Sequence, residues 1–170
     1  MTKTILNFTI LFILFVLAQA ILFNHLDIFG VAVPLVFIFW IIILPVNTGQ
    51  NKVLILSFLL GFCIDLFSDT PGMNALACTI LAGLRLPVLR LYFPREDDMT
   101  NPIPSIRSLG VGVFAKYSFT ATLVYCALYY SIEAFSFFSI WRLVYSIIAS
   151  TLTSFLIIFV IATLFNRDRK

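Results

Sequence analysis

Long apolar runs are the feature that most restricts how this chain can fold. Six stretches are almost free of charged side chains, and together they cover most of the sequence. A bilayer core about 30 Å thick is crossed by a helix of roughly 20 apolar residues. The whole chain is 61% hydrophobic and 11% charged, with a mean hydropathy of +1.07, whereas an ordinary soluble domain is about 45–50% apolar and about 25% charged. The sequence therefore predicts an integral membrane protein.

Hydropathy predicts one all-α transmembrane domain over residues 1–170. Backbone polar groups find no water in hydrocarbon, so each span must satisfy its own hydrogen bonds as a helix. No run shows the ten-residue alternation of a membrane barrel. Pro34 fits the first turn of the short second run, where the missing N–H costs little. The six expected transmembrane helices are about 4–23, 31–46, 53–67, 71–92, 109–130 and 138–165.

The basic residues predict the orientation of these spans. Lysine and arginine in short loops stay in the cytoplasm. With a cytoplasmic N-terminus, Arg142 alone remains outside, while Arg85 and Lys116 lie near enough to the inner side to extend toward it. The inner side then holds Lys3, Lys52, Arg90, Arg95, Arg107, Arg167, Arg169 and Lys170. An even number of spans with both termini inside follows from this distribution.

The first apolar run also has features of a secretory signal. Lys3, an apolar stretch and Ala18-Gln19-Ala20 follow the order of a charged region, a hydrophobic region and a cleavage site. However, the apolar run continues to Phe23, and its removal would leave five spans with a conflicting distribution of basic residues. We therefore expect it to be retained as the first span. N-terminal sequencing of the purified protein that began at Ile21 would contradict this expectation.

Residue types that carry catalysis or bind metals are sparse. Cys63, Cys78 and Cys126 are isolated within apolar runs, and His25 is the only histidine, a pattern that favours packing over disulfides or metal ligands. The sequence contains no Gly-rich phosphate loop, HExxH motif or GxSxG motif. The inner loop at 94–108 is interpreted as a solvated connector, with docking of a cytoplasmic partner as the alternative. We expect no enzymatic activity, metal, cofactor or nucleic-acid partner.

Scarce polar residues gather in the stretch GFCIDLFSDTPGMNAL, residues 61–76. A helix that starts at Lys52 and rises 1.5 Å per residue places Asp65 roughly 20 Å along its axis, near the outer interface. Asp65 and Asp69 are one helical turn apart, but no histidine or lysine stands near them in sequence to support acid–base catalysis. A carboxylate at this depth costs a few kcal/mol unless it faces a partner.

Partners for Asp65 lie directly across the turn. They are Asn74 and the first N–H groups of the next helix, which Asp69 or Thr70 is expected to cap, with Pro71 in the first turn. The stretch therefore predicts a polar clasp that closes a helical hairpin. A site that docks a partner or faces a substrate is the alternative, and the two interpretations are compatible.

Small residues at helical spacing predict close helix packing. Most such stripes pack within one chain, and the remainder bind helices of other proteins. The stripes are Ser57 and Gly61 on the third span; Ala75, Cys78, Thr79, Ala82 and Gly83 on the fourth; and Ser146, Ala149, Ser150, Thr153 and Ser154 on the sixth.

Three arginines lie near span ends. Arg85 and Arg90, on either side of Pro87, are interpreted as cations that extend toward the inner interface. Arg142 stands near the outer end of the sixth span, where it is expected to pair with Glu133 or Asp65 or to meet an external partner.

Residues 59–85 resemble the central signature of the bacterial rod shape-determining MreD family. That signature joins a Gly-x-x-x-Asp helix end, a Ser-x-x-Pro-x-Gly turn and a helix that begins Asn/His-Ala-Leu. In this sequence Pro71 and Gly72 are adjacent, where many members place a further residue between them. The matching positions are Gly61, Asp65, Ser68, Pro71, Gly72, Asn74, Ala75 and Leu76.

The resemblance implies a non-catalytic scaffold of the cell-elongation machinery in the bacterial inner membrane. Its fold would be similar to that of the substrate-binding subunits of energy-coupling-factor vitamin transporters. Its partners would be MreC and, with it, RodA, the cognate penicillin-binding transpeptidase, MreB and membrane lipid. The structural and partner-binding motif would consist of Gly61, Asp65, Ser68, Asp69, Pro71, Gly72, Asn74 and Arg85. The charges of Glu133 and Arg142, which lie outside the resemblance, separately indicate an outer interface.

The alternative function is that of a substrate-binding membrane subunit of a vitamin uptake transporter. Such a protein would bring several polar and aromatic groups together in its outer links, whereas here those links are short and carry few such groups. The scaffold is therefore the leading hypothesis.

Overall fold

The computed structural model describes residues 2–23, 33–70, 72–93, 103–133 and 140–167, and the structural statements below refer to these ranges. All the regular secondary structure in them is helical, as the sequence predicts. The elements are α1 (Thr2–Ala18), the π-helical turn η1 (Gln19–Phe23), α2 (Ile38–Ile42), α3 (Gln50–Ser68), α4 (Met73–Tyr92), α5 (Ile106–Leu109), α6 (Val111–Glu133) and α7 (Ile140–Arg167).

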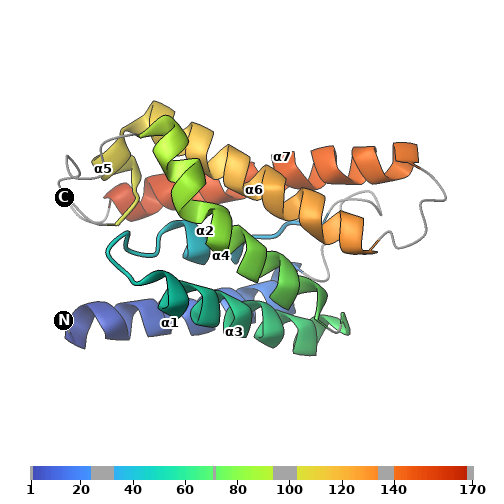
Figure 1. Cartoon of the computed structure of the whole chain (residues 1–170), viewed down its shortest axis with the longest axis horizontal. Helices are drawn as coiled ribbons and strands as arrows, with labels where there is room; N and C mark the ends of the chain where they lie inside the picture. The colour runs from blue at the N-terminus through green and yellow to red at the C-terminus, as the bar shows by residue number, and fades with distance from the viewer. Residues whose placement is uncertain (1, 24–32, 71, 94–102, 134–139, 168–170) are drawn as a thin grey trace.

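The helices form an elongated bundle in which α1, α3 and α7 follow the long axis and α4 and α6 cross it at an angle (Figure 1). Helix α1 begins and α7 ends at the same end of the molecule. We call this the first end, and the opposite end, where α3 meets α4, the second end. Helices α1 and α3 both run from the first end to the second, and from α3 onward the long helices α3, α4, α6 and α7 alternate in direction (Figure 1).

Four helices are long and apolar enough to cross a membrane: α3, α4, α6 and α7. They correspond to the third, fourth, fifth and sixth expected spans. The first expected span appears as a shorter apolar helix over residues 6–21, which includes the start of η1. The count of six crossings and the orientation of the chain stay predictions.

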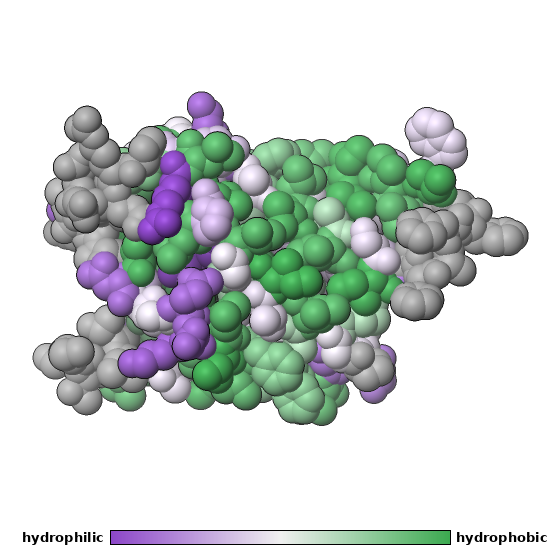
Figure 2. Space-filling model, in the orientation of Figure 1, coloured by the Kyte–Doolittle hydropathy of each residue, from purple (hydrophilic) through white to green (hydrophobic). Residues whose placement is uncertain are grey.

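Charged side chains separate between the two ends. Hydrophobic residues cover the middle of the face shown in Figure 2, and hydrophilic residues gather toward the first end. The acidic residues described by the structure lie toward the second end: Asp65 in the last turns of α3, Asp69 directly after α3, and Glu133 at the end of α6. Arg142 also lies there. The basic residues toward the first end are Lys52, Arg85, Arg90, Arg107 and Lys116.

The second expected span, 31–46, differs from the prediction. Over its described part the only helix is α2, which has five residues and is flanked by non-helical backbone. Residues 34–44 are all buried. The expectation of a continuous helix at 31–46 was therefore wrong. The prediction assumed that lipid surrounds the segment, so that only a helix could form its backbone hydrogen bonds. The segment instead lies inside the protein, where side chains can form hydrogen bonds with non-helical backbone.

Side chains of η1 and α7 provide these hydrogen bonds near the second end. Gln19 accepts from the Val36 N–H through Oε1 at 3.1 Å and donates through Nε2 to the Pro34 carbonyl at 3.0 Å. The hydroxyl oxygens of Ser154 and Ser150 accept from the backbone N–H groups of Leu35 and Val33 at 2.8 and 3.3 Å. Part of the serine stripe of α7 therefore binds the chain's own backbone.

Arg85 holds the other end of the same segment. Its Nη1 donates to the Leu44 carbonyl at 2.6 Å, and its Nη2 donates to the Pro45 carbonyl at 3.3 Å. The side chain is only 2% exposed. The interpretation of Arg85 as a cation that reaches the interface was wrong, because two backbone carbonyls of the non-helical segment draw the guanidinium inward.

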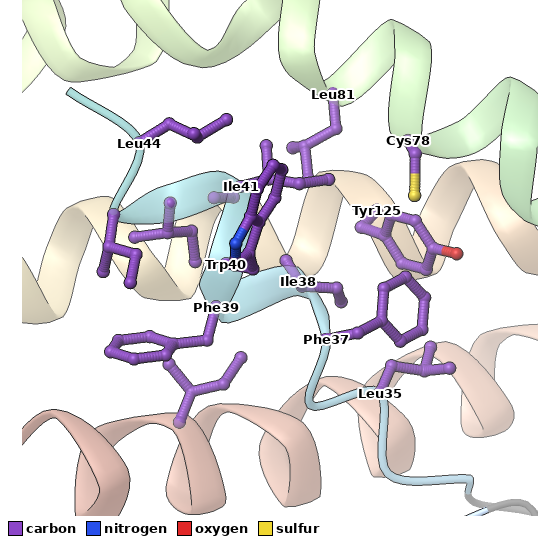
Figure 3. Packing of buried hydrophobic residues seen from close by; sticks show 14 of the residues in the cluster. Leu35, Phe37, Ile38, Phe39, Trp40, Ile41, Leu44, Cys78, Leu81 and Tyr125 are labelled. Carbon is purple, nitrogen blue, oxygen red and sulfur yellow. The ribbon is translucent and has the colours of Figure 1, made fainter. Parts of the chain in front are cut away.

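The side chains of this segment form the centre of the hydrophobic core. Figure 3 shows Phe37 next to Tyr125 of α6, and Ile41 of α2 pointing toward Leu81 of α4. The Phe37 and Tyr125 rings meet edge to face with centroids 5.5 Å apart, and Trp40 meets Phe12 of α1 at 5.3 Å. Packing of this kind, rather than expulsion of water, holds helices together in a bilayer.

We predict that Gln19→Leu destabilises the protein. Leucine fills a similar volume but leaves the Val36 N–H and the Pro34 carbonyl without their side-chain partner, and each buried group left unpaired costs about 1–3 kcal/mol. The midpoint of thermal unfolding in detergent should fall by about 5 °C or more. Asn51→Leu, which replaces an exposed amide on α3, is the matched control, and equal midpoints for the two variants would contradict the role of Gln19.

Candidate functional site

The α3–α4 hairpin is closed by a carboxylate that receives four hydrogen bonds. Asp65 lies near the end of α3 and is 5% exposed. Its Oδ1 accepts from Thr70 Oγ1 at 2.9 Å, from the Asn74 backbone N–H at 2.9 Å and from Asn74 Nδ2 at 3.0 Å. Its Oδ2 accepts from the Ala75 N–H at 2.9 Å. The polar clasp that the sequence predicts around Asp65 and Asn74 is thus present.

The Asp65 carboxylate caps the N-terminus of α4. The first N–H groups of a helix have no partner within it, and negative charge near them is favourable. Asp65 takes the N–H groups of Asn74 and Ala75 in the first turn of α4. The expected capping by Asp69 or Thr70 was wrong: Gly72 occupies the N-cap position and has no side chain to bond with, so the preceding helix supplies the acceptor.

Asn74 connects the clasp to a third helix. The Tyr125 hydroxyl on α6 donates to Asn74 Oδ1 at 2.6 Å, and Asn74 Nδ2 also donates to Thr70 Oγ1 at 3.0 Å. Asn74 and Tyr125 are 2% and 0% exposed. Tyr125 was not among the residues predicted for the site, although a tyrosine within an apolar span was a usable signal, because a buried hydroxyl normally finds a partner.

Gly61 lets the two helices touch through their backbones. A Cβ atom at this position would lie 2.6 Å from both the N and the Cα of Ala75, and it would also collide with the Asn74 carbonyl oxygen. Every larger residue must therefore push α3 and α4 apart. Of the small residues singled out in the sequence, Gly61 is the one whose lack of a side chain this crossing requires.

The turn between the helices uses left-handed backbone. Asp69 ends α3 with φ 51° and ψ 34°, and Gly72 precedes α4 with φ 82° and ψ −6°. Aspartate tolerates this region better than most residues, and glycine has no penalty there. The Asp69 side chain is exposed and Ser68 is half-buried. Pro71 lies outside the described residues.

The residues expected at the outer interface do not pair. Glu133 ends α6 and Arg142 lies in the first turn of α7, and both are exposed. Among the described residues no ion pair joins Arg142 to Glu133, and the four hydrogen bonds to Asp65 all come from other groups. Arg142 stands beside Trp141, which is 87% exposed.

The outward face of the hairpin carries a groove of about 690 Å³. Small residues of α4 line it together with exposed apolar side chains, and two phenylalanine rings of α3 stack with centroids 6.2 Å apart. Asp65 and Asp69 also line it. The other lining residues are Phe58, Phe62, Leu66, Gly72, Ala75, Leu76 and Thr79. We call this surface the hairpin groove.

A separate cavity of about 310 Å³ lies near the second end and is lined by residues of the clasp, η1, α6 and the non-helical segment. Its polar lining includes Gln19, Ser68, Asp69, Thr70 and Asn74, and its other lining residues are Val33, Leu35, Ile64, Phe67 and Tyr129. We call it the outer cavity.

The chemistry of the clasp is that of a structural lock. Both Asp65 oxygens accept hydrogen bonds, from Thr70, Asn74 and Ala75. Within the described ranges, no group of three or more His, Cys, Asp or Glu side chains is arranged to hold a metal ion. Cys78 and Cys126 are free thiols in the core.

Comparison of the chain with protein-family models, with curated proteins and with solved structures found no match. The class that the fold defines is an all-helical protein with four helices able to cross a membrane.

We predict that Gly61→Ala destabilises the hairpin. The new methyl group forces the α3 and α4 backbones apart, and overpacking of this kind costs about 1–3 kcal/mol. Gly83→Ala on α4 is the matched control, because its nearest neighbour would be a Leu54 methyl carbon at an ordinary 3.9 Å. Thermal unfolding in detergent should separate the two variants, and equal stability would contradict the close approach at Gly61.

Proposed function

We propose that this chain is a non-catalytic membrane scaffold of the MreD type, which binds MreC in the bacterial inner membrane and helps organise peptidoglycan synthesis during elongation. One observation carries the proposal. The signature positions Gly61, Asp65 and Asn74 are the residues that lock α3 against α4. A family signature that codes for a rigid hairpin is expected where the hairpin presents a binding surface.

The burial of the clasp supports a structural rather than a chemical role. Asp65 and Asn74 are both almost wholly buried, and a charged group at membrane depth is stabilised only when donors surround it. The four hydrogen bonds to Asp65 hold its carboxyl group against the start of α4 rather than leaving it available to a substrate. A carboxyl group held in this way supports the proposal of a scaffold rather than an enzyme.

The hairpin groove is the surface that we assign to the membrane span of MreC. Gly72, Ala75 and Thr79 let an added helix approach closely, while Phe58 and Phe62, which are 48% and 45% exposed, offer aromatic side chains for packing against it. The clasp lies directly behind this face, so the groove is rigid before the partner binds. Little order is then lost on association.

The second end of the bundle is assigned to the periplasmic part of MreC. Asp69, Glu133 and Arg142 are exposed there and leave charges of both signs available for contact. Trp141 and Tyr145, which are 87% and 59% exposed, add the aromatic side chains that are enriched at protein interfaces. RodA, the transpeptidase and MreB would join the assembly through MreC.

Crosslinking in the native bacterium, followed by gentle detergent purification of the tagged protein and mass spectrometry, tests the proposal. We expect MreC, RodA and the transpeptidase to co-purify. Recovery of an ATPase pair with a transport-coupling membrane subunit, and without MreC, would refute it.

Variants of the groove separate partner binding from folding. Phe62→Ala and Leu76→Ala remove exposed side chains, which are 45% and 50% accessible, so we expect unchanged thermal stability but several-fold less co-purified MreC. Leu156→Ala removes a comparably exposed side chain from α7 and should leave MreC recovery unchanged. Equal recovery from all three variants would argue against the hairpin groove as the binding surface.

Variants of the clasp should lose both stability and partner binding. Asp65→Ala leaves the N–H groups of Asn74 and Ala75 unpaired, and Gly72→Leu places a side chain at φ 82°, which costs roughly 1–2 kcal/mol. Asn51→Ala changes an exposed amide at the start of α3, away from the clasp and the hairpin groove, so it serves as the control. Wild-type amounts of MreC with both clasp variants would count against the scaffold.

The outer cavity supports a second candidate, a substrate-binding subunit of a vitamin transporter. Its volume of about 310 Å³ and its mixed polar and apolar lining are suited to a small organic molecule. Calorimetric titration of the purified protein with a panel of vitamins is the direct test. Sub-micromolar binding that is lost in Tyr129→Ala would favour this function over the scaffold.

A further inference from the structure

A third hollow lies at the first end of the bundle, away from the hairpin. It has a volume of about 500 Å³ and is formed by α1, α2, the residues around α5, α6 and α7. Its lining is mixed, with apolar side chains on one part and polar side chains on another. The apolar side chains that matter here are Phe8, Leu11, Phe39, Phe114, Ala162 and Phe165. The inner part of the hollow is therefore suited to a hydrocarbon chain.

Polar side chains line the same hollow. Asn7 of α1, Arg107 of α5 and Asn166 of α7 are exposed lining residues from three different elements. Arg107 has no ion-pair or hydrogen-bond partner among the described residues, so its guanidinium remains available. Arginine and amide N–H groups are the donors that proteins use for phosphate oxygens.

The position of Arg107 is fixed by local hydrogen bonds. Ser105 Oγ accepts from the Ser108 N–H at 3.3 Å, and Ser108 Oγ accepts from the Ser105 N–H at 2.9 Å, which makes a reciprocal capping box around α5. Ser108 Oγ also donates to the Ile103 carbonyl at 2.8 Å. The backbone that carries Arg107 is thus held in place before any ligand binds.

We propose that this hollow binds an anionic phospholipid, with the phosphate against Arg107 and the flanking amides and one acyl chain along the apolar walls. The ligand class follows from the combination of a cation, amide donors and a hydrocarbon lining in one hollow at the end of a membrane bundle. Basic pockets between transmembrane helices on the cytoplasmic side bind lipid head groups in this way. A soluble phosphate compound would leave the apolar walls uncovered.

This site does not depend on the proposed scaffold function. It shares no lining residue with the hairpin groove or the outer cavity. Loss of MreC binding would leave it unaffected, and failure of the lipid test would leave the scaffold unaffected.

The test uses the full chain, delipidated in mild detergent and then exposed to phosphatidylglycerol or phosphatidylcholine at equal concentration. Native mass spectrometry counts the lipids retained. We expect preferential retention of phosphatidylglycerol, and a reduction of about fivefold in Arg107→Gln, the effect of one basic residue on an anionic lipid. Arg142→Gln, which changes an exposed arginine at the second end, should retain lipid as the wild type does.

Two further experiments test whether the bound phosphate group belongs to a lipid and whether the apolar lining contributes to binding. Millimolar inorganic phosphate should not displace phosphatidylglycerol, and displacement would overturn the lipid assignment in favour of a soluble anion. Ala162→Phe narrows the apolar part and should lower retention while Arg107 is intact. Equal retention of the two lipids by the wild type, or unchanged retention in Arg107→Gln, would overturn the proposal.

Discussion

Backbone that leaves the helical conformation inside a membrane bundle must find its hydrogen bonds in side chains, and the structure is organised around this requirement. At the hairpin, Asp65 takes the first N–H groups of α4. In the core, Gln19 and Ser154 bond the extended approach to α2, and Arg85 bonds the carbonyls that follow it. In each case a buried polar side chain stands where regular helix hydrogen bonding stops.

This organisation explains why so few polar residues remain for chemistry. The buried polar residues that the sequence makes conspicuous, Asp65, Asn74 and Arg85, are all engaged with backbone or with one another. The main features of the molecular surface are a groove beside the α3–α4 hairpin and a hollow toward each end of the bundle. Such a surface is suited to binding helices and lipids.

The non-helical core segment and the Asp65–Asn74 clasp are connected through Tyr125 of α6. The non-helical segment packs Phe37 against Tyr125, and Tyr125 in turn donates to Asn74 in the clasp. The hairpin is therefore positioned by the core segment and not by its own turn alone. We infer that damage to Gln19 or Arg85 will reach the hairpin through α6 as well as through lost backbone bonds.

The sequence by itself determined that the protein belongs to a membrane, that its secondary structure is helical, where α3, α4, α6 and α7 lie, and that Asp65 closes a hairpin with Asn74. These features depend on hydropathy or on residues close together in the chain. Only the tertiary structure decided that the described part of the apolar run at 31–46 is not one continuous helix, because hydropathy does not distinguish a segment surrounded by lipid from one surrounded by protein. Its partners are distant in sequence: Ser154 is 119 residues from Leu35, and Arg85 is 41 from Leu44. No local pattern encodes such pairs, so the roles of Gln19, Arg85 and Tyr125 came from the packing of the helices.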